Sequence, residues 1–126
     1  MVACLLAVPA TAQELRPAPD YFVEAAMWMT TANILAVNCR TLSVDSAAAA
    51  QLSGEVLDRL TQDGFSPQTL PQEMEDPSGA IAVLQDAFVA RHGLTDGASQ
   101  EAVCDAGLAE IGEATGIGAL LLEVEG

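Results

Sequence analysis

Three cysteines and one histidine are the side chains of this sequence best suited to chemistry: Cys4, Cys39, Cys104 and His92. Cys4 lies in an apolar N-terminal segment that we expect to be removed, which leaves two cysteines in the mature chain. An even pair of cysteines in an exported protein predicts a disulfide, here between Cys39 and Cys104. Such a bridge would stabilise the domain by roughly 4 kcal/mol, because it closes a long loop in the unfolded chain.

The disulfide has two rivals, a reactive thiol and a metal site. A reactive cysteine needs a nearby base that forms the thiolate. A structural zinc ion needs four Cys or His ligands, and too few remain without Cys4. The disulfide is therefore the interpretation we adopt for Cys39 and Cys104.

The histidine has a local explanation. "ARHG" places Arg91 and His92 at the end of a predicted helix, where cationic side chains interact favourably with the helix dipole. A histidine in that role does not favour a Ser–His–acid triad, and no glycine-rich phosphate loop follows a strand. We predict no catalytic and no cofactor-binding residue, and a protein that is not an enzyme.

Two groups of acids are candidates for a metal site. Glu73, Glu75 and Asp76 cluster in "EMEDP", but a calcium loop would place ligands at alternate positions around a glycine. Asp76 is also a good candidate to cap the next helix. Glu110 and Glu113 can share a helix face, like half of a carboxylate-bridged metal site, but a second half containing histidine is missing. We predict no metal ligand.

Residues 1–12 resemble a signal peptide. An apolar run ends at Pro9, and Ala10-Thr11-Ala12 has the small-x-small pattern of a signal-peptidase site, so a mature chain would begin at Gln13. No Lys or Arg precedes the apolar run, which favours a natural start upstream of Met1. The alternative is an ordinary apolar N-terminus. The segment predicts a periplasmic or secreted protein.

The charge of the chain limits its partners. Eighteen Asp and Glu residues against four arginines and no lysine give a net charge of −14. This argues against nucleic acid and against an anionic membrane surface. The acids form either a solvated surface or, alternatively, a surface for a basic partner. After residue 12, no apolar run approaches the ~20 residues of a membrane span.

Periodicity predicts a single all-α domain of about five helices over residues 20–126, after an extended arm at 13–19. The helices are expected at 21–39, which should be central, in the segment 46–64, at 66–70, at 77–92 and from Ser99 onward. Asp20, Asp45 and Asp76 are candidate N-caps, and Gly64 and Gly93 candidate C-terminal residues. No two-residue period stands out, so we expect no sheet.

Glycines are unusually frequent in the last predicted helix. Each of Gly107, Gly112 and Gly116 would weaken it by up to ~1 kcal/mol. Close approach to another helix is one reason for glycine at these positions. The alternative is a helix that breaks before a short final turn through Leu122.

Three segments carry a family resemblance: "AVNC" at 36–39, "GFSPQTL" at 64–70 and "VCDAGLAEIGEATGIGALL" at 103–121. Over residues 20–122 the sequence resembles the domain-of-unknown-function family numbered 5333, short exported proteins of alphaproteobacteria. The resemblance implies export and supports the disulfide. It implies no activity.

These observations favour an exported, non-enzymatic interaction or accessory module that binds a protein partner. A carrier of a small ligand or lipid is the alternative, and it would need an apolar cavity of a few hundred Å³ between helices. A metal-dependent or hydrolytic enzyme is a third hypothesis, and it would need a bound metal or converging carboxylates with perturbed pKa values. The sequence does not indicate an oligomeric state.

Overall fold

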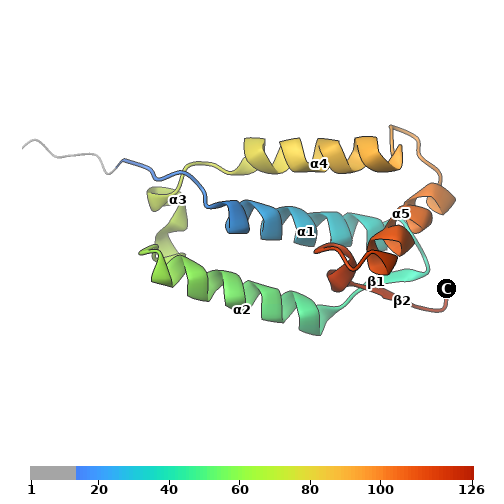
Figure 1. The fold of residues 1–126 in the computed structure, drawn as a ribbon, viewed down its shortest axis with the longest axis horizontal. Helices are drawn as coiled ribbons and strands as arrows, with labels where there is room; N and C mark the ends of the chain where they lie inside the picture. The colour runs from blue at the N-terminus through green and yellow to red at the C-terminus, as the bar shows by residue number, and fades with distance from the viewer. Residues whose placement is uncertain (1–13) are drawn as a thin grey trace, which may run out of the picture.

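Three long helices form most of the domain in a computed structural model that describes residues 14–126. They are α1 (Asp20–Val37), α2 (Ser46–Gln62) and α4 (Ser78–His92). The helix α1 lies between the other two and packs against both (Figure 1). The prediction of a central first helix is confirmed. Its wide apolar surface is explained by neighbours on two sides.

Shorter elements complete the two ends of this group of helices. At one end, the 3-10 helix η1 (Pro67–Thr69) and the one-turn helix α3 (Leu70–Glu73) connect α2 to α4 (Figure 1). At the other end, α5 (Gln100–Gly112) and the 3-10 helix η2 (Gly118–Leu120) pack against α1. The domain is thus mostly helical, with five α-helices among residues 14–126, as predicted.

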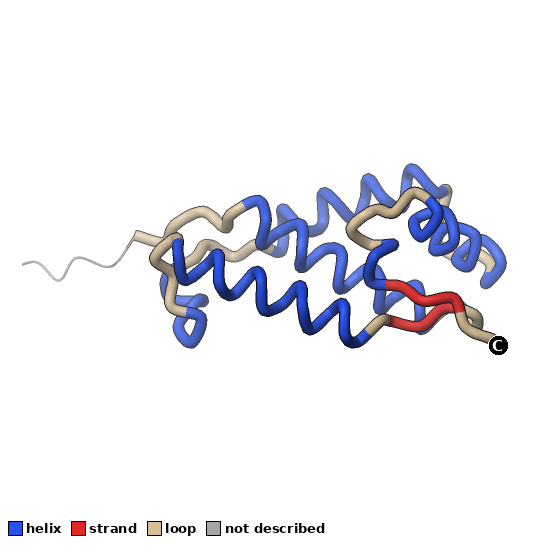
Figure 2. Tube along the Cα trace, turned by 60° about the horizontal axis from the view of Figure 1, so that its bottom comes forward, coloured by secondary structure: helices blue, strands red, loops and turns tan. Residues whose placement is uncertain are grey.

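The expectation that the domain contains no sheet is wrong. Strands β1 (Leu42–Val44) and β2 (Leu121–Glu123) pair in antiparallel fashion, with Leu42 opposite Glu123 and Val44 opposite Leu121 (Figure 2). Strands of three residues are too short to show a two-residue period. They also lie far apart in the sequence, one after α1 and the other after η2, so only the tertiary fold brings them together.

Two apolar clusters hold the domain together. The larger joins α1, α4, α5 and the small sheet, and includes Leu35, Leu42, Phe88, Ile117 and Leu120. The smaller lies at the α3 end and is centred on three buried side chains, Leu60, Phe65 and Met74. Half-buried neighbours on the N-terminal arm, α1, α2 and α3 pack around it. This second cluster underlies the surface hollows described below.

Of the three aspartates expected as N-caps, only Asp45 occupies that position. The Asp45 carboxylate accepts from Ala48 N–H at the start of α2, and Ser99 Oγ accepts from Ala102 N–H at the start of α5. Asp20 and Asp76 do not occupy the N-cap position, which belongs to Pro19 for α1 and Pro77 for α4. The Asp76 carboxylate still bonds the first turn of α4.

Three helices end in the same backbone motif. Gly64 and Gly93 follow α2 and α4 with φ angles of +87° and +64°. The next amide in each case bonds five residues back, Phe65 N–H to Leu60 O and Leu94 N–H to Val89 O. This is the Schellman arrangement that the glycines predict. The third example, after α5, has Ala114 in the glycine position with a φ of 51°.

The glycine-rich end is not one continuous helix. Because α5 stops at Gly112, the broken-helix interpretation holds for residues 113–117. Close approach also occurs, but mainly outside helix crossings. A Cβ on Gly107 would lie 2.3 Å from Leu42 Cδ1 of β1, and one on Gly116 would lie 2.3 Å from the Trp28 ring. Gly112 has nothing within 4 Å, so its proposed place at a crossing is wrong.

The predicted signal peptide at 1–12, with Cys4, and Gln13 lie outside the described residues. The chain before α1 runs alongside the end of α3. Arg16 N–H donates to Glu73 O, and Glu75 N–H donates to Arg16 O, each at 2.8 Å. Within residues 14–126, none of the helices combines the length and hydrophobicity needed to cross a membrane.

Candidate functional site

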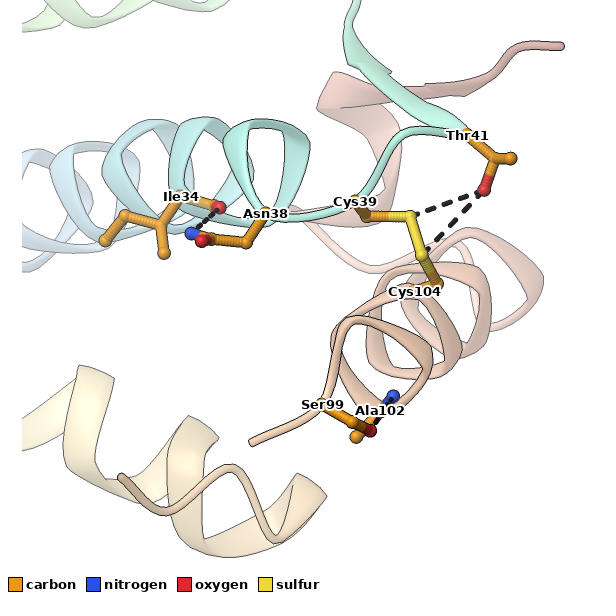
Figure 3. The surroundings of a disulfide bond; sticks show 7 residues. All are labelled: Ile34, Asn38, Cys39, Thr41, Ser99, Ala102 and Cys104. Carbon is orange, nitrogen blue, oxygen red and sulfur yellow. Dashed lines mark hydrogen bonds between the residues drawn. A yellow bond between two sulfur atoms is a disulfide. The ribbon is translucent and has the colours of Figure 1, made fainter. Parts of the chain in front are cut away.

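The disulfide links the segment after α1 to the first half of α5. Cys39 and Cys104 are bonded, with their Cα atoms 5.2 Å apart and 65 positions apart in sequence (Figure 3). Cys39 is 1% exposed and belongs to the larger core cluster. The predicted pairing is confirmed. The bridge holds α5 against the end of α1, where the sheet also forms.

Local hydrogen bonds fix the chain around the bridge. The Asn38 side chain turns back and donates to Ile34 O at 2.8 Å, just after α1 ends at Val37 (Figure 3). The Thr41 hydroxyl donates to Cys39 Sγ at 3.3 Å and lies 3.9 Å from Cys104 Sγ. Because both sulfur atoms are joined in the disulfide, neither cysteine is a free thiol.

A buried carboxylate forms the most unusual polar cluster of the domain. Glu110 of α5 is fully buried, with 0% of its side chain exposed. Its Oε1 accepts from Arg91 Nη2 and from His92 Nε2, the latter at 2.9 Å. Its Oε2 accepts from the Thr115 hydroxyl, whose oxygen in turn accepts from Gly118 N–H at 3.0 Å. The cluster joins the end of α4, α5 and the segment that follows α5.

Hydrogen bonding explains how a charge can be buried here. Burial raises the pKa of Glu110, but the hydrogen bonds from Thr115, His92 and Arg91 outweigh it, so that the pKa lies below its ordinary value of 4.5. The carboxylate is therefore ionised at neutral pH. Arg91 remains 58% exposed, so solvent still hydrates the positive partner. An ion pair with one solvated member avoids much of the cost of burying two charges.

The interpretation of His92 as a helix-end cation is incomplete. His92 does lie in the last turn of α4, beside Arg91. Its ring, however, donates to Glu110 and packs against the Phe88 ring in a tilted arrangement, with ring centroids 4.6 Å apart. Sequence reasoning missed this cluster. The only available signal was a glutamate within an otherwise apolar face of the last predicted helix.

The other acids do not converge on a metal site. Glu73 accepts from Ser66 N–H and from the Thr69 hydroxyl, and so caps η1. The Asp76 carboxylate accepts from Ser78 N–H at 2.9 Å, which lowers its pKa. Glu113 is exposed, whereas Glu110 is buried. No cluster of three or more potential metal ligands occurs within residues 14–126.

A second polar cluster lies at the α3 end. The Tyr21 hydroxyl donates to Asp63 Oδ2 at 2.6 Å. Burial, helped by this bond, raises the pKa of Tyr21 to about 12. The Arg59 guanidinium lies 4.0 Å from the centre of the Tyr21 ring, and that of Arg16 lies 3.9 Å from the Phe65 ring. These contacts hold both arginines against aromatic rings.

Three of the surface hollows have a mainly apolar lining and could receive a ligand. One of about 290 Å³ lies beside Glu110, with Trp28, Phe88 and Arg91 among its walls. A second, of about 450 Å³, lies between α1 and α2, and a third, of about 410 Å³, lies beside α3. Phe22 and Leu70 line both of the larger hollows. We call these two adjoining hollows the Phe22–Leu70 groove.

The fold and these sites define a small, disulfide-bonded helical domain whose buried polar groups serve packing and whose open surface includes an apolar groove. The chain belongs to a family of unknown function, DUF5333, whose family model matches residues 14–122. It has no significant match among curated proteins or among solved structures. The expected family is confirmed, while export and bacterial group remain predictions.

Proposed function

We propose that the protein is a non-enzymatic binding module of an oxidising compartment, the periplasm or the exterior of the cell. The observation that carries this proposal is the Phe22–Leu70 groove. It lies over the small second core cluster, whose apolar neighbours Phe22, Val56 and Leu70 remain partly exposed. Leu57, at its edge, is 45% exposed. Contiguous exposed apolar surface commonly marks an interaction site.

The compartment is inferred from the disulfide and the N-terminus together. Structural disulfides persist in oxidising environments and are rare in reducing ones. The apolar residues 2–8, followed by Ala10-Thr11-Ala12, have the pattern of a cleavable export signal. These two features are independent of each other, and both favour a location outside the cytoplasm.

The proposal of a non-enzymatic role rests on how the reactive groups are used. The single histidine bonds Glu110, and both oxygens of Glu110 are bonded inside the domain. A general base must instead reach a substrate proton directly or through one water. The two described cysteines are joined to each other. These groups therefore serve the fold.

A carrier of a small apolar ligand is the second candidate. The groove supports it as well, because hollows of about 410 and 450 Å³ fall within the usual size of ligand pockets. Mass spectrometry of the protein isolated under native conditions distinguishes the two. A small molecule that is retained in the native state and released on denaturation would favour the carrier.

Photo-crosslinking in cells that naturally produce the protein tests the binding module. One variant carries a photoreactive residue in place of Leu57 in the groove. The matched control carries it in place of Glu101, an exposed residue of α5 that lines none of the three hollows. We expect a discrete adduct of protein mass from the Leu57 position alone. Equal adducts from both positions, or none from Leu57, would contradict a protein-binding groove.

The location is tested separately on the same cells. The protein recovered from the periplasm or medium should begin near Gln13, and alkylation without reduction should leave Cys39 and Cys104 unmodified. A cytoplasmic protein that retains residues 1–12 would overturn the proposed export.

A further inference from the structure

The Phe22–Leu70 groove differs in charge from one end to the other. The hollow between α1 and α2 is lined without any charged residue, by Ala26, Met29, Val56 and Leu57 among others. The hollow beside α3 has the apolar residues Leu15, Met74 and Pro77 in its walls, but also Glu75 and Asp76. Both hollows of the groove therefore have apolar walls, and the one beside α3 is also acidic.

The two acids have no positive partner of their own. Both are exposed, and neither forms an ion pair with a basic side chain within residues 14–126. Arg16 and Arg59 lie at the same end of the domain, but their guanidinium groups rest on the rings of Phe65 and Tyr21. No basic residue is among those that line the groove.

We propose that the groove binds a peptide segment of a partner protein that carries apolar side chains along one face and Arg or Lys at one end. The apolar side chains lie over Phe22 and Leu70, and the basic end lies beside Glu75 and Asp76. Binding of an amphipathic segment in an apolar groove is a common mode of recognition. Attraction between the basic end and the two acids sets the direction in which the segment binds. The net charge of −14 also accelerates the association of a basic segment with the protein. This inference rests on the proposed binding function and specifies the partner.

The charge distribution selects a basic peptide over the other occupants of an apolar groove. A second copy of the chain would bring another fourteen net negative charges to the same surface. An anionic lipid surface would be repelled for the same reason. A basic amphipathic segment gains from both features of the groove, its apolar walls and its acidic end.

Binding of a defined synthetic peptide tests the inference. The probe is a fluorescent helical peptide with leucines at every third or fourth position and arginines at one end. Its control is a scrambled peptide of the same composition, without the leucine periodicity. We expect salt-sensitive binding of the first peptide, and binding of the scrambled one weaker by about tenfold or more.

Matched variants locate the binding site. The double variant Glu75→Gln, Asp76→Asn should weaken binding by about fivefold or more. Asp76→Asn retains a side-chain oxygen that can accept the hydrogen bond from Ser78 N–H at the start of α4. The control is Glu123→Gln, Glu125→Gln, which changes the charge equally on the C-terminal segment and should have little effect.

A second pair of variants tests the apolar wall. Leu57→Ser should weaken binding more than Leu122→Ser on β2. These leucines are similarly exposed, at 45% and 47%, but only Leu57 lines the groove.

Three outcomes would overturn the inference: equal binding of the scrambled peptide, equal weakening by the two pairs of acid variants, or no binding of either peptide. The crosslinking experiment shows whether only the basic-peptide inference fails or the proposed binding function fails with it. A crosslinked protein at Leu57 without affinity for the basic peptide would leave the binding module standing and reject its basic partner.

Discussion

His92 Nε2 lies 2.9 Å from Glu110 Oε1, which joins the last turn of α4 to a fully buried carboxylate on α5. The same oxygen accepts from Arg91, and the other oxygen accepts from Thr115. The Gly118 backbone packs on the backbone carbonyl of Glu110 so closely that no Cβ would fit there, and its N–H donates to the Thr115 hydroxyl oxygen. Residues of α4, α5, the following turn and η2 thus meet at one side chain.

Replacing Glu110 by Gln should destabilise the domain by roughly 1–3 kcal/mol. An amide keeps the shape of the side chain, but one of its ends donates where the carboxylate accepts, so that buried donors lose their partner. The free energy of unfolding in urea measures the effect. Glu113→Gln, at an exposed position on the same helix end, should change it by less than about 0.5 kcal/mol. Equal effects would show that the cluster contributes nothing specific.

The contribution of Glu110 to stability should disappear in acid. Because the pKa of Glu110 is lower in the folded than in the unfolded protein, its stabilising effect is complete above its ordinary value of 4.5. The effect is lost as the pH falls through the lower native value. The difference in unfolding free energy between the natural protein and Glu110→Gln should therefore shrink as the pH falls from about 5 into the acid range. A difference that stays constant over this range would contradict the assignment.

Removing the disulfide should destabilise the domain by roughly 2–4 kcal/mol, since the bridge joins residues 65 positions apart. The measurement compares thermal unfolding with and without reductant, in a Cys4→Ser background that leaves one possible pair. Reductant should lower the Tm there and have no effect when Cys39→Ala and Cys104→Ala are both present. A Tm insensitive to reductant in the first protein would show that the bridge is not formed.

Two glycines of α5 should respond to alanine in opposite directions. Gly107→Ala places a methyl group against the buried Leu42 side chain and should destabilise the domain by roughly 1–3 kcal/mol through overpacking. Gly112→Ala meets open space and should stabilise by up to ~1 kcal/mol through helix propensity. Urea unfolding of both variants checks the pair. Stabilisation by both would mean that β1 does not pack tightly on α5.

Ala114→Gly should stabilise the domain by up to ~1 kcal/mol. Ala114 holds a left-handed conformation, with a φ of 51°, which a side chain disfavours and glycine accepts. Ala109→Gly, in the exposed interior of α5, should instead destabilise by about 1 kcal/mol. Thermal unfolding of the two variants measures this contrast. A loss of stability in both would indicate that residue 114 is not left-handed in solution.

The helix ends show where sequence reasoning succeeds and where it stops. Gly64 and Gly93 mark their turns because glycine readily adopts a positive φ. The same turn after α5 has Ala114 in the left-handed position, and an alanine in the sequence does not indicate such a turn. There the turn places Thr115 so that its N–H bonds Glu110 O while its hydroxyl bonds the Glu110 carboxylate. That tertiary contact offsets the local strain.

The candidate site divides in the same way. Cys39 and Cys104 could be paired from the sequence, because once Cys4 is set aside only one disulfide is possible. His92 could be placed at a helix end, but not on Glu110, since a local pattern contains no information about which helix crosses it. The Phe22–Leu70 groove was likewise unpredictable, as its walls come from the arm, α1, α2 and α3.

The sequence by itself determined the helical class, the approximate extents of the long helices and the disulfide partners. These depend on side-chain period, on caps within a few residues and on the number of cysteines, all of which are local or compositional. Only the tertiary structure decided the β1–β2 pairing, the polar cluster at Glu110 and the groove with one acidic end. Each of these needs residues that are distant in sequence to meet, and packing free energy summed over the whole chain determines which of them do.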